Sequence, residues 1–151
     1  MVTRRDVLIG AAGTIALAAV PGRASASVDH QVLMLNKGAK GVMVFEPDLI
    51  IASPGDTVTF VPTDKGHNAE SIKGMLPADT KPFKGKINEQ ITITVEAEGV
   101  YGIKCTPHYA MGMIALVVAG TPVNLEEAKT VRHPGQAKKR FEDVFAEVPS
   151  T

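Results

Sequence analysis

Between Val28 and about Val118 the apolar positions fall in short runs that predict β-strands. Turn-forming clusters of Gly, Pro, Asn and Asp separate the runs, as is typical where strands end. In Thr57–Val61 and Ile91–Val95 the threonines alternate with apolar residues, so the two kinds of side chain face opposite sides of a strand. The predicted strands comprise residues 32–34, 43–45, 49–51, 58–61, 91–95, 100–103 and 114–118. Strands of this length and spacing predict a two-sheet sandwich or a small barrel.

The last thirty residues predict two helices, at about 124–148. Asn124 is expected to cap a first helix at Leu125–Lys129, and a second helical pattern follows Pro134 and Gly135. In the second pattern the apolar side chains recur on one face, and they are Ala137, Phe141, Val144, Phe145 and Val148. We expect both helices to pack on the sandwich.

The N-terminus predicts a secretory signal peptide over residues 1–26. The pair Arg4–Arg5 precedes an apolar run at Val7–Val20, and Ala24–Ala26 supplies a small-residue cleavage pattern. The apolar run is shorter than the roughly 20 residues of a membrane-spanning helix, so a cleaved signal is favoured over a membrane anchor. The paired arginines also fit a twin-arginine signal, which leaves the export route open. The sequence therefore predicts one periplasmic domain over 27–151.

The charge balance excludes a strongly basic protein. The whole chain has 16 basic and 16 acidic residues, and removal of Arg4, Arg5, Asp6 and Arg23 with the signal leaves 13 and 15. Nucleic-acid phosphates select for a strongly basic surface. Nucleic acid is therefore not an expected partner, and neither is a membrane.

The candidate chemistry lies around the single cysteine, Cys105, which can form no internal disulfide although the protein is predicted to be exported. The thiol ends one predicted strand, His108 follows three residues later in a turn, and Met113 begins the next strand. Far upstream, His67 lies in a loop after the strand that ends near Val61. Two imidazoles, a thiolate and a weak, distant thioether are typical of copper electron-transfer sites. The pattern predicts one copper ion that cycles between Cu(I) and Cu(II).

The window Cys105–Met113, the pair His67–Asn68 and the C-terminal helices resemble the pseudoazurins, which are cupredoxins (type 1 blue-copper proteins) of bacterial periplasms. The resemblance covers essentially the whole mature chain and implies an all-β fold, a Greek-key β-sandwich with two C-terminal α-helices. It implies four copper ligands, which are His67, Cys105, His108 and Met113. It also implies three residues that support the ligands, which are Asn68, Thr106 and Pro107.

The spacing alone leaves the identity of the thioether ligand open. Met111 lies six residues after Cys105, as in amicyanin-type cupredoxins, and Met113 lies eight after it, as in pseudoazurins and plastocyanins. Plastocyanins lack the two C-terminal helices predicted here. The resemblance therefore favours Met113 as the ligand and leaves Met111 as a surface residue.

The resemblance also implies a docking surface around His108. Its apolar members are Met43, Pro62, Pro107, Ala110 and Met111, and its surrounding lysines are Lys37, Lys65, Lys84 and Lys104. Such lysines would steer acidic partners toward the site. The implied function is that of a monomer that donates single electrons, in transient complexes, to a denitrification reductase such as copper nitrite reductase, with cytochromes as other partners.

Two other functions use similar residues. One is a periplasmic module for copper binding or transport, and the other is an amicyanin-like carrier for a different dehydrogenase. An enzyme is not expected, because four side chains fill the predicted site and metal catalysis generally needs an open position. The remaining histidines, His30 and His133, lie in no motif and are expected to be surface or packing residues.

Overall fold

The computed structural model describes residues 25–150. The predicted signal peptide, residues 1–26, therefore lies almost wholly outside the described residues. Within 25–150, no helix combines the length and the apolar character needed to cross a membrane.

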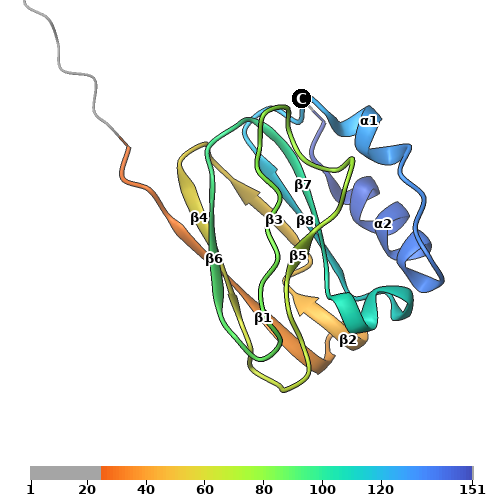
Figure 1. Cartoon of the computed structure of the whole chain (residues 1–151). Helices are drawn as coiled ribbons and strands as arrows, with labels where there is room; N and C mark the ends of the chain where they lie inside the picture. Colours follow the sequence, from red (N-terminus) through yellow and green to blue (C-terminus); the bar gives the residue numbers. More distant parts are fainter. Residues whose placement is uncertain (1–24, 151) are drawn as a thin grey trace, which may run out of the picture.

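Two four-stranded sheets form the body of the molecule (Figure 1). The strands are β1 (Asp29–Gly38), β2 (Gly41–Glu46), β3 (Leu49–Ala52), β4 (Asp56–Val61), β5 (Glu70–Ser71), β6 (Ile91–Val95), β7 (Gly99–Lys104) and β8 (Ile114–Ala119). One sheet has the order β2-β1-β4-β6 and the other β3-β8-β7-β5. The predicted all-β sandwich is confirmed. The two-residue strand β5 was not predicted, because a run so short has no recognisable alternation.

The central strand β8 shows how the sequence builds the layers. All six of its residues are buried, whereas a sheet with one solvated face would alternate. Ala115 and Val117 join the core between the sheets, and Leu116 and Val118 join a second core beneath the helices. The continuous apolar run of β8 is therefore explained by cover on both faces.

The C-terminal helices are α1 (Leu125–Lys129) and α2 (Gln136–Glu147). They cover the outer face of the β7–β8 sheet (Figure 1), and α2 buries Ala137, Phe141 and Val144 there, so the predicted helical packing is confirmed. The predicted cap is wrong, because the Asn124 side chain makes no capping bond. Its amide instead bonds the backbone of Val100 on β7, accepting from the N–H at 2.7 Å and donating to the carbonyl at 3.0 Å. A side-chain amide carries the same donor and acceptor as a peptide group, so it extends the sheet edge.

The carboxylate of Asp56 holds together the turn before β4. It accepts hydrogen bonds from the backbone N–H groups of Val28 and Ser53, both at 2.9 Å, and lies 3.0 Å from Nε2 of His30. These bonds, led by the one from Val28, lower the pKa of Asp56 to about 2. His30 is therefore a part of this turn rather than a free surface residue.

This lowered pKa predicts a loss of stability in acid. The ordinary aspartate pKa is about 3.9, so the contribution of Asp56 to the free energy of unfolding is fully present above about pH 4 and is lost as the pH falls toward 2. In Asp56→Asn that part of the pH dependence should be missing. Urea unfolding midpoints of both proteins, measured from neutral pH to about pH 2, test this; the same dependence in both would contradict it.

Candidate metal centre

Three side chains from two segments of the chain meet at one end of the sandwich. His67 lies in the loop between β4 and β5, Cys105 directly follows β7, and His108 lies in a short 3-10 helix, η1 (Thr106–Met111). The two Nδ1 atoms lie 3.1 Å apart, and the Cys105 sulfur lies 3.5 Å from Nδ1 of His108 and 3.8 Å from Nδ1 of His67. The sequence placed His108 in a turn, and the structure gives that turn the form of η1.

The hydrogen bond between His67 and Asn36 leaves Nδ1 of His67 without a proton and so able to bind a cation. Its other nitrogen, Nε2, lies 2.8 Å from Oδ1 of Asn36, and an amide oxygen only accepts, so Nε2 carries the proton. Burial and then the neighbouring His108 lower the pKa of His67, which favours the neutral ring. A bare nitrogen lone pair therefore faces a second imidazole nitrogen and a sulfur in a site where His67 and Cys105 are fully buried.

The donor set and its spacing fit a soft metal ion. The three distances between the two nitrogens and the sulfur suit an ion bound to nitrogen at roughly 2.0 Å and to sulfur at about 2.3 Å. Burial raises the pKa of the Cys105 thiol, more than its two backbone hydrogen bonds lower it. The protein alone therefore does not activate this sulfur as a nucleophile, whereas a bound cation deprotonates a coordinating thiol.

Burial distinguishes Met111 from Met113, between which the sequence spacing could not decide. Met113 is fully buried, and Met111 is 45% exposed. The backbone of Met113 also closes the ligand loop, because its N–H donates to the His108 carbonyl at 3.2 Å and its carbonyl accepts from the Cys105 N–H at 3.0 Å. Of the two thioethers, only that of Met113 belongs to the core cluster that contains Cys105.

Asn68 joins the His67 loop to the start of η1. Its Oδ1 accepts from the Thr106 N–H at 2.7 Å, and its Nδ2 donates to the Thr106 hydroxyl at 2.9 Å and to the Gly85 carbonyl at 3.1 Å. Asn68 is itself buried. Two hydrogen bonds therefore tie Asn68, next to His67, to Thr106, next to Cys105, and the third holds Asn68 to Gly85. Pro107, the third predicted support, is exposed at the start of η1 and contributes no hydrogen bond there.

Sequence reasoning missed two polar residues of this site. Asn36 lies on β1, 31 residues before His67, whose ring it orients. Glu70 on β5 accepts a hydrogen bond from the Thr106 hydroxyl at 2.6 Å. Neither lies in a predicted motif. Asn36 reaches His67 from a distant strand, and Glu70, three residues after His67, reaches Thr106 through the pairing of β5 with β7.

The predicted docking residues divide by their surroundings. Pro107, Ala110 and Met111 are exposed on η1, while Met43 and Pro62 are partly buried. Ile87, which was not predicted, is 45% exposed and lines a shallow hollow together with Pro107. The apolar surface around His108 therefore extends one residue further than the sequence suggested.

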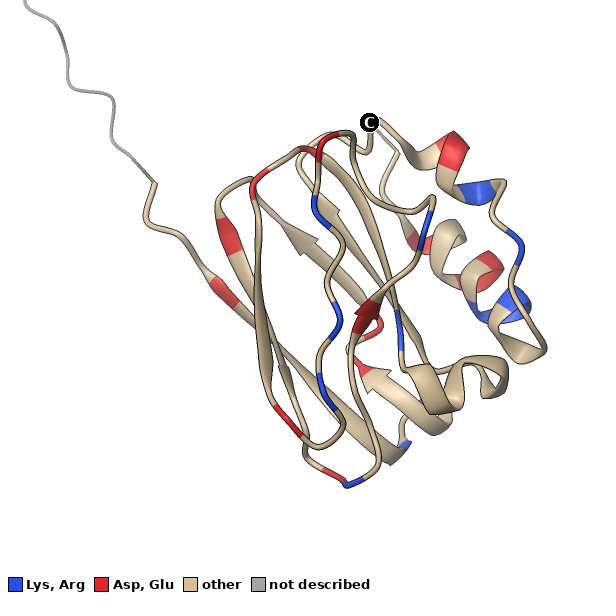
Figure 2. Ribbon diagram, in the orientation of Figure 1, with Lys and Arg blue, Asp and Glu red and all other residues tan. Residues whose placement is uncertain are grey.

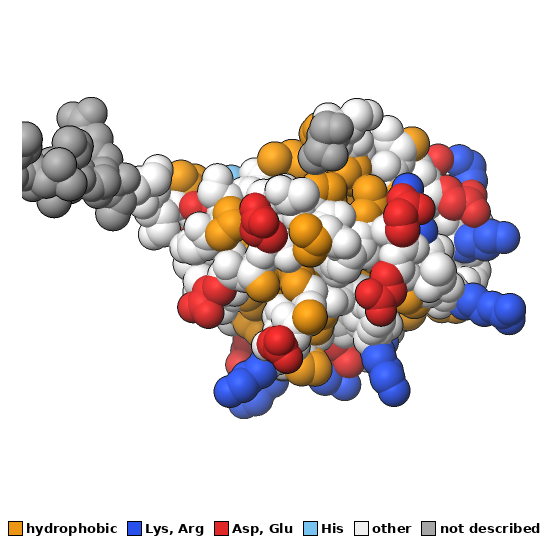
Figure 3. Space-filling model, turned by 90° about the horizontal axis from the view of Figure 1, so that it is seen from above, with side chains coloured by type: hydrophobic (Ala, Val, Ile, Leu, Met, Phe, Trp, Pro, Cys, Tyr) orange, Lys and Arg blue, Asp and Glu red, His pale blue; other side chains and the backbone are white. Residues whose placement is uncertain are grey.

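The four lysines are not equivalent. Lys84 and Lys104 both lie 4.0 Å from the carboxylate of Glu70, and Lys104 also lies 5.0 Å from the ring centre of Tyr109. Lys37 and Lys65 are exposed and make no ion pair within residues 25–150. Figure 2 shows basic residues near the end of the sandwich that carries η1. Figure 3 looks onto the opposite end, where acidic side chains are spread over the face.

Known copper proteins match both the sequence and the fold. A family model described as copper binding proteins, plastocyanin/azurin family, matches residues 32–120. The pseudoazurin of Paracoccus pantotrophus is 50% identical over 142 residues, which is 93% of this chain and 96% of that protein. The pseudoazurin of Methylorubrum extorquens is 46% identical over 139 residues, covering 91% and 94%. The crystal structure of native pseudoazurin from Hyphomicrobium denitrificans has a TM-score of 0.78 at 46% identity and covers 81% of this chain and 99% of that one.

Proposed function

This chain belongs to the pseudoazurins, within the plastocyanin/azurin family of copper-binding proteins, and we propose that it carries single electrons between redox proteins of the bacterial periplasm. It is an electron-transfer copper protein with one copper ion, and it is not an enzyme. The proposal rests on the convergence of one sulfur and two imidazole nitrogens within 3.8 Å of one another.

The proposed ligands are Nδ1 of His67, the sulfur of Cys105, Nδ1 of His108 and, on its burial beside them, Met113. When bound, copper supplies a one-electron couple between Cu(I) and Cu(II). The chain's own part is to hold the donors in one arrangement for both states. His108 is only partly buried, so its ring edge is the proposed path for electrons to a partner.

Redox cycling tests this function against a copper-transport module. We expect the copper-loaded protein to hold one copper per chain, to lose its visible band on reduction by one electron and to regain it on oxidation. The copper should stay bound during repeated cycles in the presence of a Cu(I) chelator at a moderate concentration. Loss of the metal on reduction would favour transport, because a transport site must release its cargo.

We propose further that residues 1–26 are a signal peptide and that 27–151 form the periplasmic cupredoxin domain. The support is the Arg4–Arg5 pair, the apolar run and the small residues at Ala24–Ala26. The proposed acceptor is a denitrification reductase such as copper nitrite reductase, with cytochromes as other partners. Exposed lysines around an apolar patch support an acidic partner that binds in short-lived complexes.

Lys65 offers the sharpest test of that surface, because it is exposed, unpaired within residues 25–150 and two residues from His67. At low ionic strength Lys65→Glu should slow the reaction with copper nitrite reductase by roughly three- to tenfold, since charge reversal weakens steering. Added salt should shrink the difference. Lys104 is less suitable, because a glutamate there would face Glu70.

Lys81→Glu is the matched control for Lys65→Glu. Lys81 is also exposed and unpaired within the described residues, but it follows Thr80, which lies beside the Tyr101 hydroxyl. That hydroxyl bonds Ala97 at the end of the sandwich away from the site. Stopped-flow rates for both variants decide whether Lys65 belongs to the docking surface. Equal slowing by both variants would mean that only the net charge matters. An unchanged rate in Lys65→Glu would show that Lys65 is not part of the docking surface.

A further inference from the structure

The start of α2 lies directly against η1, the helix that carries His108. A Cβ atom added at Gly112 would stand 2.9 Å from Cγ of Arg140 and 3.2 Å from Cβ of Gln136, both on α2. A Cβ at Gly135, just before α2, would overlap the carbonyl oxygen of Ala110. Glycine at 112 and 135 therefore permits close backbone approach at two points between α2 and the ligand loop.

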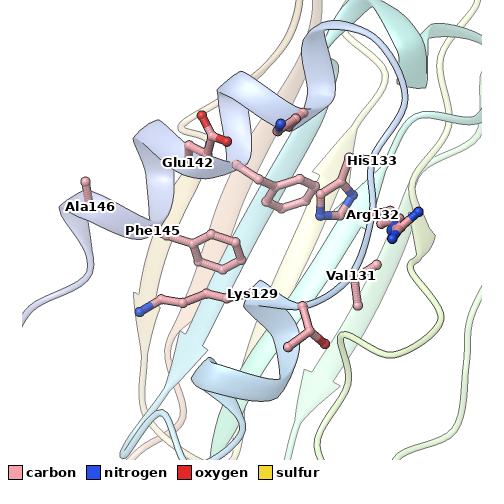
Figure 4. A pocket seen from close by; sticks show the side chains of 10 residues that line it. Lys129, Val131, Arg132, His133, Glu142, Phe145 and Ala146 are labelled. Atoms are coloured by element: carbon pink, nitrogen blue, oxygen red, sulfur yellow. The ribbon is translucent and has the colours of Figure 1, made fainter.

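A hydrogen bond between side chains lies at the same contact. The hydroxyl of Tyr109, the residue after His108, is 2.6 Å from Nδ1 of His133. A tyrosine is ordinarily protonated near neutral pH, and burial lowers the pKa of His133, which favours the neutral ring. The tyrosine hydroxyl therefore donates to the imidazole nitrogen. The ring of His133 also stacks on Phe141 of α2, with ring centres 4.2 Å apart and planes 29° apart. Figure 4 shows this imidazole beside an aromatic ring of α2, on the segment that joins the two helices.

The second ring nitrogen of His133, Nε2, makes no hydrogen bond among residues 25–150. With Nδ1 accepting, the proton lies on Nε2, which is buried. A buried donor left unpaired is unfavourable, and a phenylalanine would fill the same stacked position without that penalty. A phenylalanine would, however, leave the Tyr109 hydroxyl without this acceptor, so the bond to Tyr109 accounts for a histidine at this position.

We propose that His133 is a positioning residue, which acts through Tyr109 to couple α2 to the ligand loop and to restrict the movement of His108. The inference concerns the proposed copper site and so rests on the proposed function. Asn68 fixes the start of the loop at Thr106, the backbone of Met113 closes its end, and the Tyr109–His133 bond holds its middle. A loop held at three points keeps its ligand in one position in both oxidation states.

Amide hydrogen exchange of the full chain tests this coupling, both copper-free and with diamagnetic Cu(I). Tyr109→Phe and His133→Phe each remove the bond while they keep an aromatic ring. The N–H groups of Gly112 and Met113, which donate to carbonyls within the loop, should exchange about five- to tenfold faster in each variant, as expected for the loss of one neutral hydrogen bond. In the double variant these amides should exchange no faster than in either single variant. His133→Gln retains an acceptor for the Tyr109 hydroxyl, so its amides should keep most of the protection that His133→Phe loses.

Two further readouts separate positioning from general stability. Amides of β4 and β6 should keep their exchange rates, and the reduction potential should move in the same direction in both single variants without adding in the double one. Uniformly faster exchange over the whole chain, or unchanged exchange in the loop, would overturn the coupling. All variants should stay blue with copper, and a wild-type protein that is not blue would refute the proposed function, while the copper-free exchange would still decide the coupling.

Discussion

Replacement of Cys105 by alanine should abolish the intense visible band of the oxidised, copper-loaded protein and, with it, reversible one-electron transfer. The sulfur is one of the three atoms that face one another at the site, and thiolate bonding to Cu(II) gives blue sites their character. Without the thiolate, the two imidazoles and the weak thioether of Met113 make a much weaker site for Cu(I). The measurements are the visible spectrum, the copper stoichiometry and a voltammogram of each protein.

A pair of methionine variants provides the control for that result. Met111→Leu changes an exposed thioether and should leave the band unchanged, whereas Met113→Leu changes a buried one and should shift both the spectrum and the reduction potential. Leucine conserves volume, so neither variant should unfold the protein. An effect of Met111→Leu and none of Met113→Leu would reverse the proposed assignment of the axial ligand. A Cys105→Ala protein that is still blue would refute the site altogether.

The fold was predictable because its strands carry strong local patterns. Alternation marks β6, and turn residues bound most of the other strands. Strand β5 escaped prediction, because its two residues gain their structure by pairing with distant residues, Ile103 and Lys104 of β7 on one side and Lys84 on the other. The predicted cap at Asn124 failed for a related reason: its side chain found a better partner on a distant strand than on its own helix.

The candidate ligands were predictable from a local window and from His67 in a loop far upstream, but most of the residues that hold them were not. The window from Cys105 to Met113 brings unusual residue types together, and with His67 it predicts a metal site. The oriented ring of His67 depends on Asn36, and the partner of Tyr109 is His133, 24 residues further on. Such contacts arise from sheet and helix packing, so no spacing rule finds them. This is why His133 was expected to be a surface or packing residue, whereas the structure shows it hydrogen-bonded to Tyr109 of the ligand loop.

Replacement of Asn68 by alanine should weaken both the fold and the metal site. The variant leaves the Thr106 N–H and the Gly85 carbonyl without their partners, which should lower the free energy of unfolding by about 2–3 kcal/mol. Residues that hold ligands in place typically contribute tenfold to a hundredfold in metal affinity, and we expect a loss of that order for copper. Urea unfolding of the copper-free protein and competition with a chelator measure the two effects separately.

Asn124→Ala is the matched control, since Asn124 uses the same amide group to bond a backbone N–H and a carbonyl, those of Val100, on the segment that leads into α1. It should lower the stability by a similar amount and leave copper affinity and colour unchanged, because its bonds tie β7 to α1 and touch no candidate ligand. If Asn68→Ala behaved like Asn124→Ala in every measurement, Asn68 would only stabilise the fold. A loss of copper affinity confined to Asn68→Ala would show that its bonds to Thr106 hold the ligand loop in the geometry that copper requires.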